Sequence, residues 1–112
     1  MKALAILLAI VVSSFTGCDK LDIASGTPRC VEKKIKDYNE TSSCYNASVQ
    51  EYTFQGKTVY VFEPGTCSAD MTSELIDSDC NTLGHLGGIA GNIQINGEEF
   101  SSATFIRKVW QK

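Results

Sequence analysis

The chain has 112 residues, 43% of them hydrophobic, and a formal net charge of −3. A chain of this length forms one small domain rather than several. After residue 17 it holds all 13 acidic residues and all but one of the 10 basic residues, and this acidic character excludes electrostatic binding to nucleic acid or anionic lipid.

Residues 1–17 have the pattern of an export signal. Lys2 supplies a positive charge, residues 3–12 form an unbroken apolar run, and mostly small residues follow up to Gly17. A charged start, a short apolar run and a small-residue exit are typical of a signal peptide. Because a membrane span needs roughly 20 apolar residues, this run is too short to be one. We therefore expect residues 1–17 to be removed.

The motif Phe15-Thr16-Gly17-Cys18 resembles the lipobox of bacterial lipoproteins. The resemblance implies that Cys18 is acylated on sulfur, becomes the mature N-terminus and is acylated again on its amine. Two or more acyl chains give stable anchoring. Cleavage near Ser14 or Thr16 is the alternative, and it would leave a soluble protein with a spare thiol. We predict a protein that is lipid-anchored in the bacterial cell envelope.

The sequence permits two membranes of the envelope as the site of anchoring. We expect the outer membrane, with the domain facing the periplasm or the cell surface. Asp19 directly after Cys18 resembles an inner-membrane retention mark in some bacteria, so the inner membrane is the alternative.

Four further cysteines predict two disulfides. An even number of cysteines in a short exported chain is typical of a disulfide framework. Zinc is disfavoured, because paired zinc ligands usually lie two to four residues apart. Two pairings remain open, Cys44–Cys67 with Cys30–Cys80 or Cys30–Cys44 with Cys67–Cys80.

Residues 18–28 are polar and without periodicity, and we predict a lipidated N-terminus and tether there. A single globular domain should occupy residues 29–112. It should begin with a helix of two to three turns, with Thr27 as its N-cap and Pro28 at its first position. One face of this helix is apolar and should be buried, with Val31, Ile35 and Tyr38.

Strands should follow the helix. Residues 49–54 and 57–62 are rich in β-branched and aromatic residues and flank Gln55-Gly56, which predicts a hairpin with Phe54 opposite Lys57. Further strands are expected at 73–76 and near 103–110. The predicted fold is α+β, with one N-terminal helix packed on a four- to five-stranded antiparallel meander stapled by disulfides.

Asp77, Asp79 and Asn81 alternate as in the first half of a calcium loop. An EF-hand also needs Gly at the sixth position and Glu at the twelfth, where this chain has Thr82 and Gly88, so an EF-hand is excluded. The three residues are weak calcium candidates beside the reading of a structural turn. We predict no metal ion and no cofactor.

The glycine-rich run 84–91 favours close backbone packing over a ligand loop, since it lacks the Lys-Ser/Thr ending of phosphate-binding loops. No reactive group of residues stands out, and this favours a non-enzymatic binding or envelope-structural module that contacts an envelope protein or polysaccharide. The alternative is a small hydrolase or carbohydrate-active enzyme that uses Asp70, Asp77 or Asp79 with His85, the one histidine of the chain.

Several segments together are similar to a family of small lipoproteins with a domain of unknown function from Bacteroides-type bacteria. The matching features are residues 30–35, residues 52–62, Ile76-Asp77 leading to Asn81, residues 87–91, and Val109-Trp110. The resemblance covers residues 28–110, and it implies one envelope domain without implying an activity.

Overall fold

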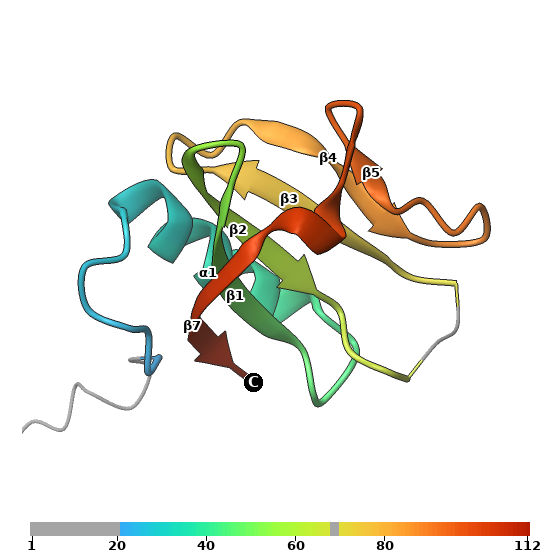
Figure 1. The fold of residues 1–112 in the computed structure, drawn as a ribbon. Helices are drawn as coiled ribbons and strands as arrows, with labels where there is room; N and C mark the ends of the chain where they lie inside the picture. The colour runs from blue at the N-terminus through green and yellow to red at the C-terminus, as the bar shows by residue number, and fades with distance from the viewer. Residues whose placement is uncertain (1–20, 68–69) are drawn as a thin grey trace, which may run out of the picture.

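The structure is a computed structural model that describes residues 21–67 and 70–112. Five strands form one antiparallel sheet in the order β4-β3-β2-β1-β7, and β5 and β6 form a separate two-stranded hairpin. The elements are α1 (Arg29–Thr41), β1 (Ser48–Phe54), β2 (Lys57–Glu63), β3 (Thr72–Asp77), β4 (Thr82–Gly87), β5 (Gln94–Ile95), β6 (Glu98–Glu99), the 3₁₀ turn η1 (Phe100–Ser102) and β7 (Thr104–Gln111). The predicted α+β class is confirmed (Figure 1).

The β1–β2 hairpin has the predicted register. Phe54 lies opposite Lys57. Gln55 and Gly56 form the turn with φ of 52° and 75°. Two positive φ values suit the right-handed twist of a hairpin, and glycine adopts such a backbone without strain.

Helix α1 covers one face of the sheet. Val31 and Ile35 are fully buried, and the ring centroid of Tyr38 lies 5.2 Å from that of Phe62 and 6.3 Å from that of Trp110. Burial, with smaller contributions from Glu63 and Glu74, raises the pKa of Tyr38 to about 12. The apolar spacing predicted from the sequence therefore gives the face that packs on the sheet.

The predicted cap of α1 is wrong. Pro28 is the N-cap residue, and Glu32 N–H donates the first helical hydrogen bond to its carbonyl. The Thr27 hydroxyl donates instead to the Ala24 carbonyl, at 2.6 Å. Thr27 is buried, so its side chain is committed to the segment before the helix and is not free to cap it.

The opposite face of the sheet is also buried. Tyr60 and Phe62 of β2 belong to the core under α1, whereas Val59 and Val61 belong to a second core. This second core lies under the segment that carries β5, β6 and η1, and its buried members are Phe54, Val59, Val61, Leu75 and Ile95. Burial on both faces explains why β2 is an unbroken apolar run from residue 59 to residue 62.

Two disulfides fasten opposite ends of the sheet. Cys30–Cys80 joins the first turn of α1 to the turn between β3 and β4. Cys44–Cys67 joins the loop before β1 to the loop after β2. Of the two pairings that the sequence leaves open, the structure therefore has Cys30–Cys80 with Cys44–Cys67.

Residues 21–27, the leading segment, lie along the outer edge of β7. Ala24 N–H donates to the Val109 carbonyl at 2.9 Å, and Arg107 Nη1 donates to the Ser25 carbonyl at 2.8 Å. Leu21, Ile23 and Ala24 pack against the core under α1. Of the tether predicted over 18–28, the described residues 21–27 are thus docked on the domain. Cys18 and the predicted signal peptide 1–17 lie outside the described residues.

Candidate functional site

An apolar cleft of about 270 Å³ opens on the side of the sheet turned away from α1. β4 supplies one wall, and the chain that runs through β5, β6 and η1 supplies the other. The lining residues are Leu86, Asn92, Ile93, Glu99, Phe100 and Ser101.

Phe100 fixes the inner end of this cleft. Its ring centroid lies 5.0 Å from that of Tyr52 and 5.1 Å from that of Phe54, both on β1. The Phe100 N–H donates to the Ile93 carbonyl at 2.9 Å, which ties η1 to the segment before β5. The aromatic floor and the wall that carries Ile93 are therefore held together.

Asn92 holds the second wall against β4. Its side-chain Nδ2 donates to the His85 carbonyl at 2.6 Å and to the Gln94 carbonyl at 2.9 Å. Its backbone pairs with Gly87 in both directions, at 2.8 and 3.2 Å. Because these bonds occupy both the side chain and the backbone, Asn92 builds the cleft and is not a free polar contact for a ligand.

Gly84 explains part of the glycine-rich run. A Cβ at this position would lie 2.8 Å from Cδ1 of Ile95, which is fully buried. The missing side chain lets β5 close over β4. This supports the prediction of close backbone packing at this glycine.

The rim of the cleft combines apolar and acidic groups. The Ile93 side chain is 59% exposed, Glu99 lines the cleft with it, and both Glu99 and its neighbour in sequence, Glu98, are exposed. Each glutamate accepts a hydrogen bond from a nearby serine hydroxyl. In residues 21–67 and 70–112 no lysine or arginine forms an ion pair with either one. The rim can therefore receive an apolar side chain with a cation next to it.

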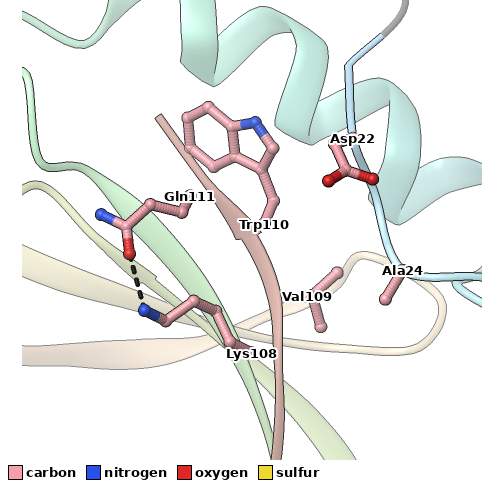
Figure 2. Close-up of a pocket in the computed structure, with 6 residues that line it drawn as sticks. All are labelled: Asp22, Ala24, Lys108, Val109, Trp110 and Gln111. Carbon is pink, nitrogen blue, oxygen red and sulfur yellow. Dashed lines mark hydrogen bonds between the residues drawn. The ribbon is translucent and has the colours of Figure 1, made fainter.

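A second cleft, drawn in Figure 2, has a different character. It lies where the leading segment meets β7, and its lining mixes polar and apolar residues. Lys108 Nζ donates to Gln111 Oε1 at 2.7 Å, and Asp22 lies on the opposite side, beside Trp110 (Figure 2). This cleft is the groove that remains where the leading segment packs against β7.

The acidic turn 77–81 is closed by its own hydrogen bonds. Asp77 Oδ1 accepts the N–H groups of Asp79 and Asn81, both at 2.9 Å, and Oδ2 accepts Asn81 Nδ2 at 3.2 Å. The hydrogen bond from Asn81 N–H is the largest influence on this carboxyl and lowers its pKa. The structure brings the three calcium candidates into one turn, but Asn81 presents its amide nitrogen to Asp77. Among the described residues no three His, Cys, Asp or Glu side chains could jointly hold a metal ion.

Calcium should therefore leave the melting temperature almost unchanged. A site with a Kd of about 0.1 mM would stabilise the fold by about 1.4 kcal/mol at about 1 mM calcium. This would raise the melting temperature of a domain of this size by roughly 6–11 °C. We expect a difference below about 2 °C between EDTA and calcium, measured by thermal unfolding. A larger shift that Asp77→Asn/Asp79→Asn abolishes would establish a calcium site.

The residues predicted for a hydrolase are spread over the sheet. Asp70 precedes β3 and Asp77 ends it, and at about 3.3 Å per residue this strand alone spans about 17 Å. His85 lies opposite Glu74 in the middle of β3 and β4. Two cooperating carboxyl groups in glycosidases lie about 5–9.5 Å apart. Asp70 and Asp77 therefore lie too far apart to form such a pair of carboxyl groups.

Glu74, which the sequence analysis did not single out, lies opposite His85 and has two side-chain partners. It accepts the Thr82 hydroxyl at 2.7 Å and pairs with Lys34 Nζ of α1 at 3.1 Å. Burial raises its pKa, but these two partners outweigh burial and lower the pKa below its ordinary value. This arrangement ties α1 to β3 and β4, which is a structural role.

The sequence did not identify the cleft residues as a site. Ile93 alternates with Ile95 over only three residues, and Phe100 stands singly among polar residues, so neither belongs to a long alternating run that marks a strand. Apolar residues on each side of Asn96-Gly97, a dipeptide that favours a turn, were the available signal. They become a site because the β5–β6 hairpin folds back over the sheet.

The family comparison matches residues 34–112 with a domain of unknown function, DUF6970. Neither the curated proteins nor the solved structures gave a match. The matched residues contain the whole sheet, both walls of the apolar cleft and most of α1. The chain therefore belongs to the DUF6970 family.

Proposed function

We propose that this protein is a lipid-anchored, non-enzymatic module of the bacterial cell envelope that binds a protein partner through the apolar cleft. The observation that carries the binding role is the cleft itself, an apolar hollow with the Phe100 ring at its inner end and with exposed Ile93 and Glu99 at its rim. Among the described residues, no lysine or arginine forms an ion pair with Glu99. Binding pockets are typically concave and mostly apolar, with a few polar groups at the edge.

The envelope location has separate support. The apolar run that ends in Phe15-Thr16-Gly17-Cys18 favours export and acylation of Cys18. The two disulfides are consistent with an extracytoplasmic domain. In the part of the chain that the structure describes, no helix is long and apolar enough to cross a membrane. On the family resemblance we also propose the outer membrane of a Bacteroides-type bacterium as the site of anchoring.

The chemistry of the cleft favours a protein partner over a polysaccharide. The floor and the exposed wall offer Leu86, Ile93 and Phe100, whose surfaces suit an apolar side chain. Glu99 adds negative charge at the rim. We therefore propose that the recognised element is an apolar side chain next to a lysine or arginine.

Short peptides test this proposal directly. N-acetyl-Phe-Lys-amide should bind weakly, with a Kd of about 1 mM, and should shift the NMR amide signals of Leu86, Ile93 and Phe100. N-acetyl-Ala-Lys-amide, which lacks the ring, and N-acetyl-Phe-Glu-amide, which reverses the charge, should both bind more weakly. Equal shifts with all three peptides would refute the proposed recognition.

Two isoleucines of similar exposure provide a matched pair of variants. Ile93→Ser should weaken binding of the Phe-Lys peptide about tenfold, because it removes apolar surface from the cleft wall. Ile106→Ser on β7 should leave binding unchanged, since Ile106 is 48% exposed but does not line the cleft. If a neutral oligosaccharide shifted the cleft signals while the peptides did not, the partner would be a polysaccharide.

A further inference from the structure

A strongly exposed tyrosine lies at the end of the sheet where the chain enters the domain. Tyr45 is 79% exposed in the loop 42–47 that precedes β1. A single exposed aromatic side chain needs no functional explanation. Tyr45 is of interest because of its position relative to the predicted lipid anchor at Cys18.

The leading segment runs antiparallel to β7 at this end. Ala24 N–H donates to the Val109 carbonyl, and the chain passes from there back to Leu21, alongside the last residues of β7. β7 pairs with β1, with Gln111 opposite Ser48. Neighbouring strands lie about 4.8 Å apart, and β7 lies between the leading segment and β1, so these two are about 10 Å apart. The near end of β1 follows directly on the Tyr45 loop. The start of the described chain and the end of β7 lie at the same side of the domain in Figure 1.

The Tyr45 loop is fastened at several points. Cys44 beside it is disulfide-bonded to Cys67, and Asn46 exchanges hydrogen bonds with Thr66 at 2.8 and 3.1 Å. Lys112 donates from its backbone to the Ala47 carbonyl and from Nζ to the Ser42 carbonyl. These bonds keep the loop in place while the tyrosine ring stays in solvent.

The distance to the anchor is short. Two residues, 19 and 20, separate Cys18 from Leu21, and the three Cα–Cα steps between them span at most about 11 Å when the chain is fully extended. If Cys18 is acylated, the domain cannot move far from the headgroups of its own bilayer. The end of the sheet that holds Leu21 and the Tyr45 loop must then lie next to the membrane surface.

We infer that the Tyr45 loop docks on the bilayer that holds the lipid anchor. Tyrosine is favoured at a membrane–water interface, because its ring is apolar and its hydroxyl is polar. The inference rests on the proposed anchoring at Cys18. Contact at this end covers neither face of the sheet, so the apolar cleft stays open to a partner.

Quenching by brominated lipids tests the inference. The chain carries one tryptophan, Trp110, which is 3% exposed and serves as an unquenched reference. The lipidated chain with Tyr45→Trp is reconstituted into vesicles of brominated phosphatidylcholine. We expect it to lose fluorescence relative to vesicles of unbrominated lipid. Asp79→Trp, in the exposed turn at the opposite end of the sheet, should show no such loss.

A second preparation separates the inference from the proposed function. The form that starts at Cys18 is coupled through that thiol to a maleimide phospholipid, so that anchoring no longer depends on the cell. If Tyr45→Trp is quenched in this coupled form, but the protein from cells carries no acyl chain, the proposed anchoring is overturned. The docking surface is then supported independently of the anchor. Firm anchoring without quenching at position 45, or equal quenching at position 79, would overturn the docking inference and leave the anchor in place.

Discussion

Removal of the Cys30–Cys80 disulfide by Cys30→Ala/Cys80→Ala should lower the free energy of unfolding by about 4 kcal/mol. The bond closes a loop with a sequence separation of 50, so its loss restores much conformational freedom to the unfolded chain. It also joins the first turn of α1 to the β3–β4 turn, next to the buried Val31. In thermal unfolding the melting temperature should fall by roughly 16–32 °C.

The second disulfide is the matched comparison. Cys44→Ala/Cys67→Ala opens a loop with a sequence separation of 23, and the same relation gives a loss of about 3.4 kcal/mol. Both losses should be found by chemical denaturation of the oxidised variants. A loss below about 1 kcal/mol for the Cys30–Cys80 variant would show that this bond contributes little to stability.

The second large effect concerns the anchor. Cys18→Ser should abolish incorporation of a labelled fatty acid into the protein, because serine has no thiol to carry the acyl chain. The uncleaved precursor should then accumulate, or a soluble form should be released. The measurement is fatty-acid labelling in cells, followed by separation of membrane and soluble fractions.

Thr16→Ser is the control for that substitution, since it keeps a small hydroxyl residue before Cys18. It should label like the parent protein. Undiminished labelling in Cys18→Ser would place the lipid elsewhere or refute the anchor.

The sequence predicts the elements that depend on local patterns. The β1–β2 hairpin follows from Gln55-Gly56 and from the β-branched and aromatic residues around it, because the turn fixes the register and each strand pair then follows. The helix face follows from the spacing of Val31, Ile35 and Tyr38, whose side chains lie on one side of a helix. In both cases residues close in sequence determine the structure.

Features set by distant contacts were not predictable. Thr27 has the residue type of a helix cap, but the leading segment holds its hydroxyl. That segment looks like a tether because its apolar residues, Leu21, Ile23 and Ala24, show no periodicity. In the structure they are partly buried against the core under α1, beside β7. The choice between the two disulfide pairings likewise depends on how α1 lies across the sheet.

The cleft shows the same limit. One wall has Leu86 of β4, and the other has residues 92–93 and 99–101, which come before β5 and from the end of the β5–β6 hairpin onward. Glycines at positions such as Gly84 indicate close packing but not the partner that fills the space, which here is Ile95. The acidic turn could be read from sequence as a structural turn because its hydrogen bonds join near neighbours, Asp77 with Asp79 and Asn81.

The most direct test of the account is the mass of the N-terminal peptide of the protein extracted from its own membranes. Proteolysis followed by mass spectrometry should find a peptide that starts at Cys18 and carries acyl chains on its sulfur and its amine. The same preparation should contain no peptide from residues 1–17. A peptide that starts at another residue, or an unmodified Cys18 in membrane-extracted protein, would contradict the proposal that this module is held in the envelope by lipid.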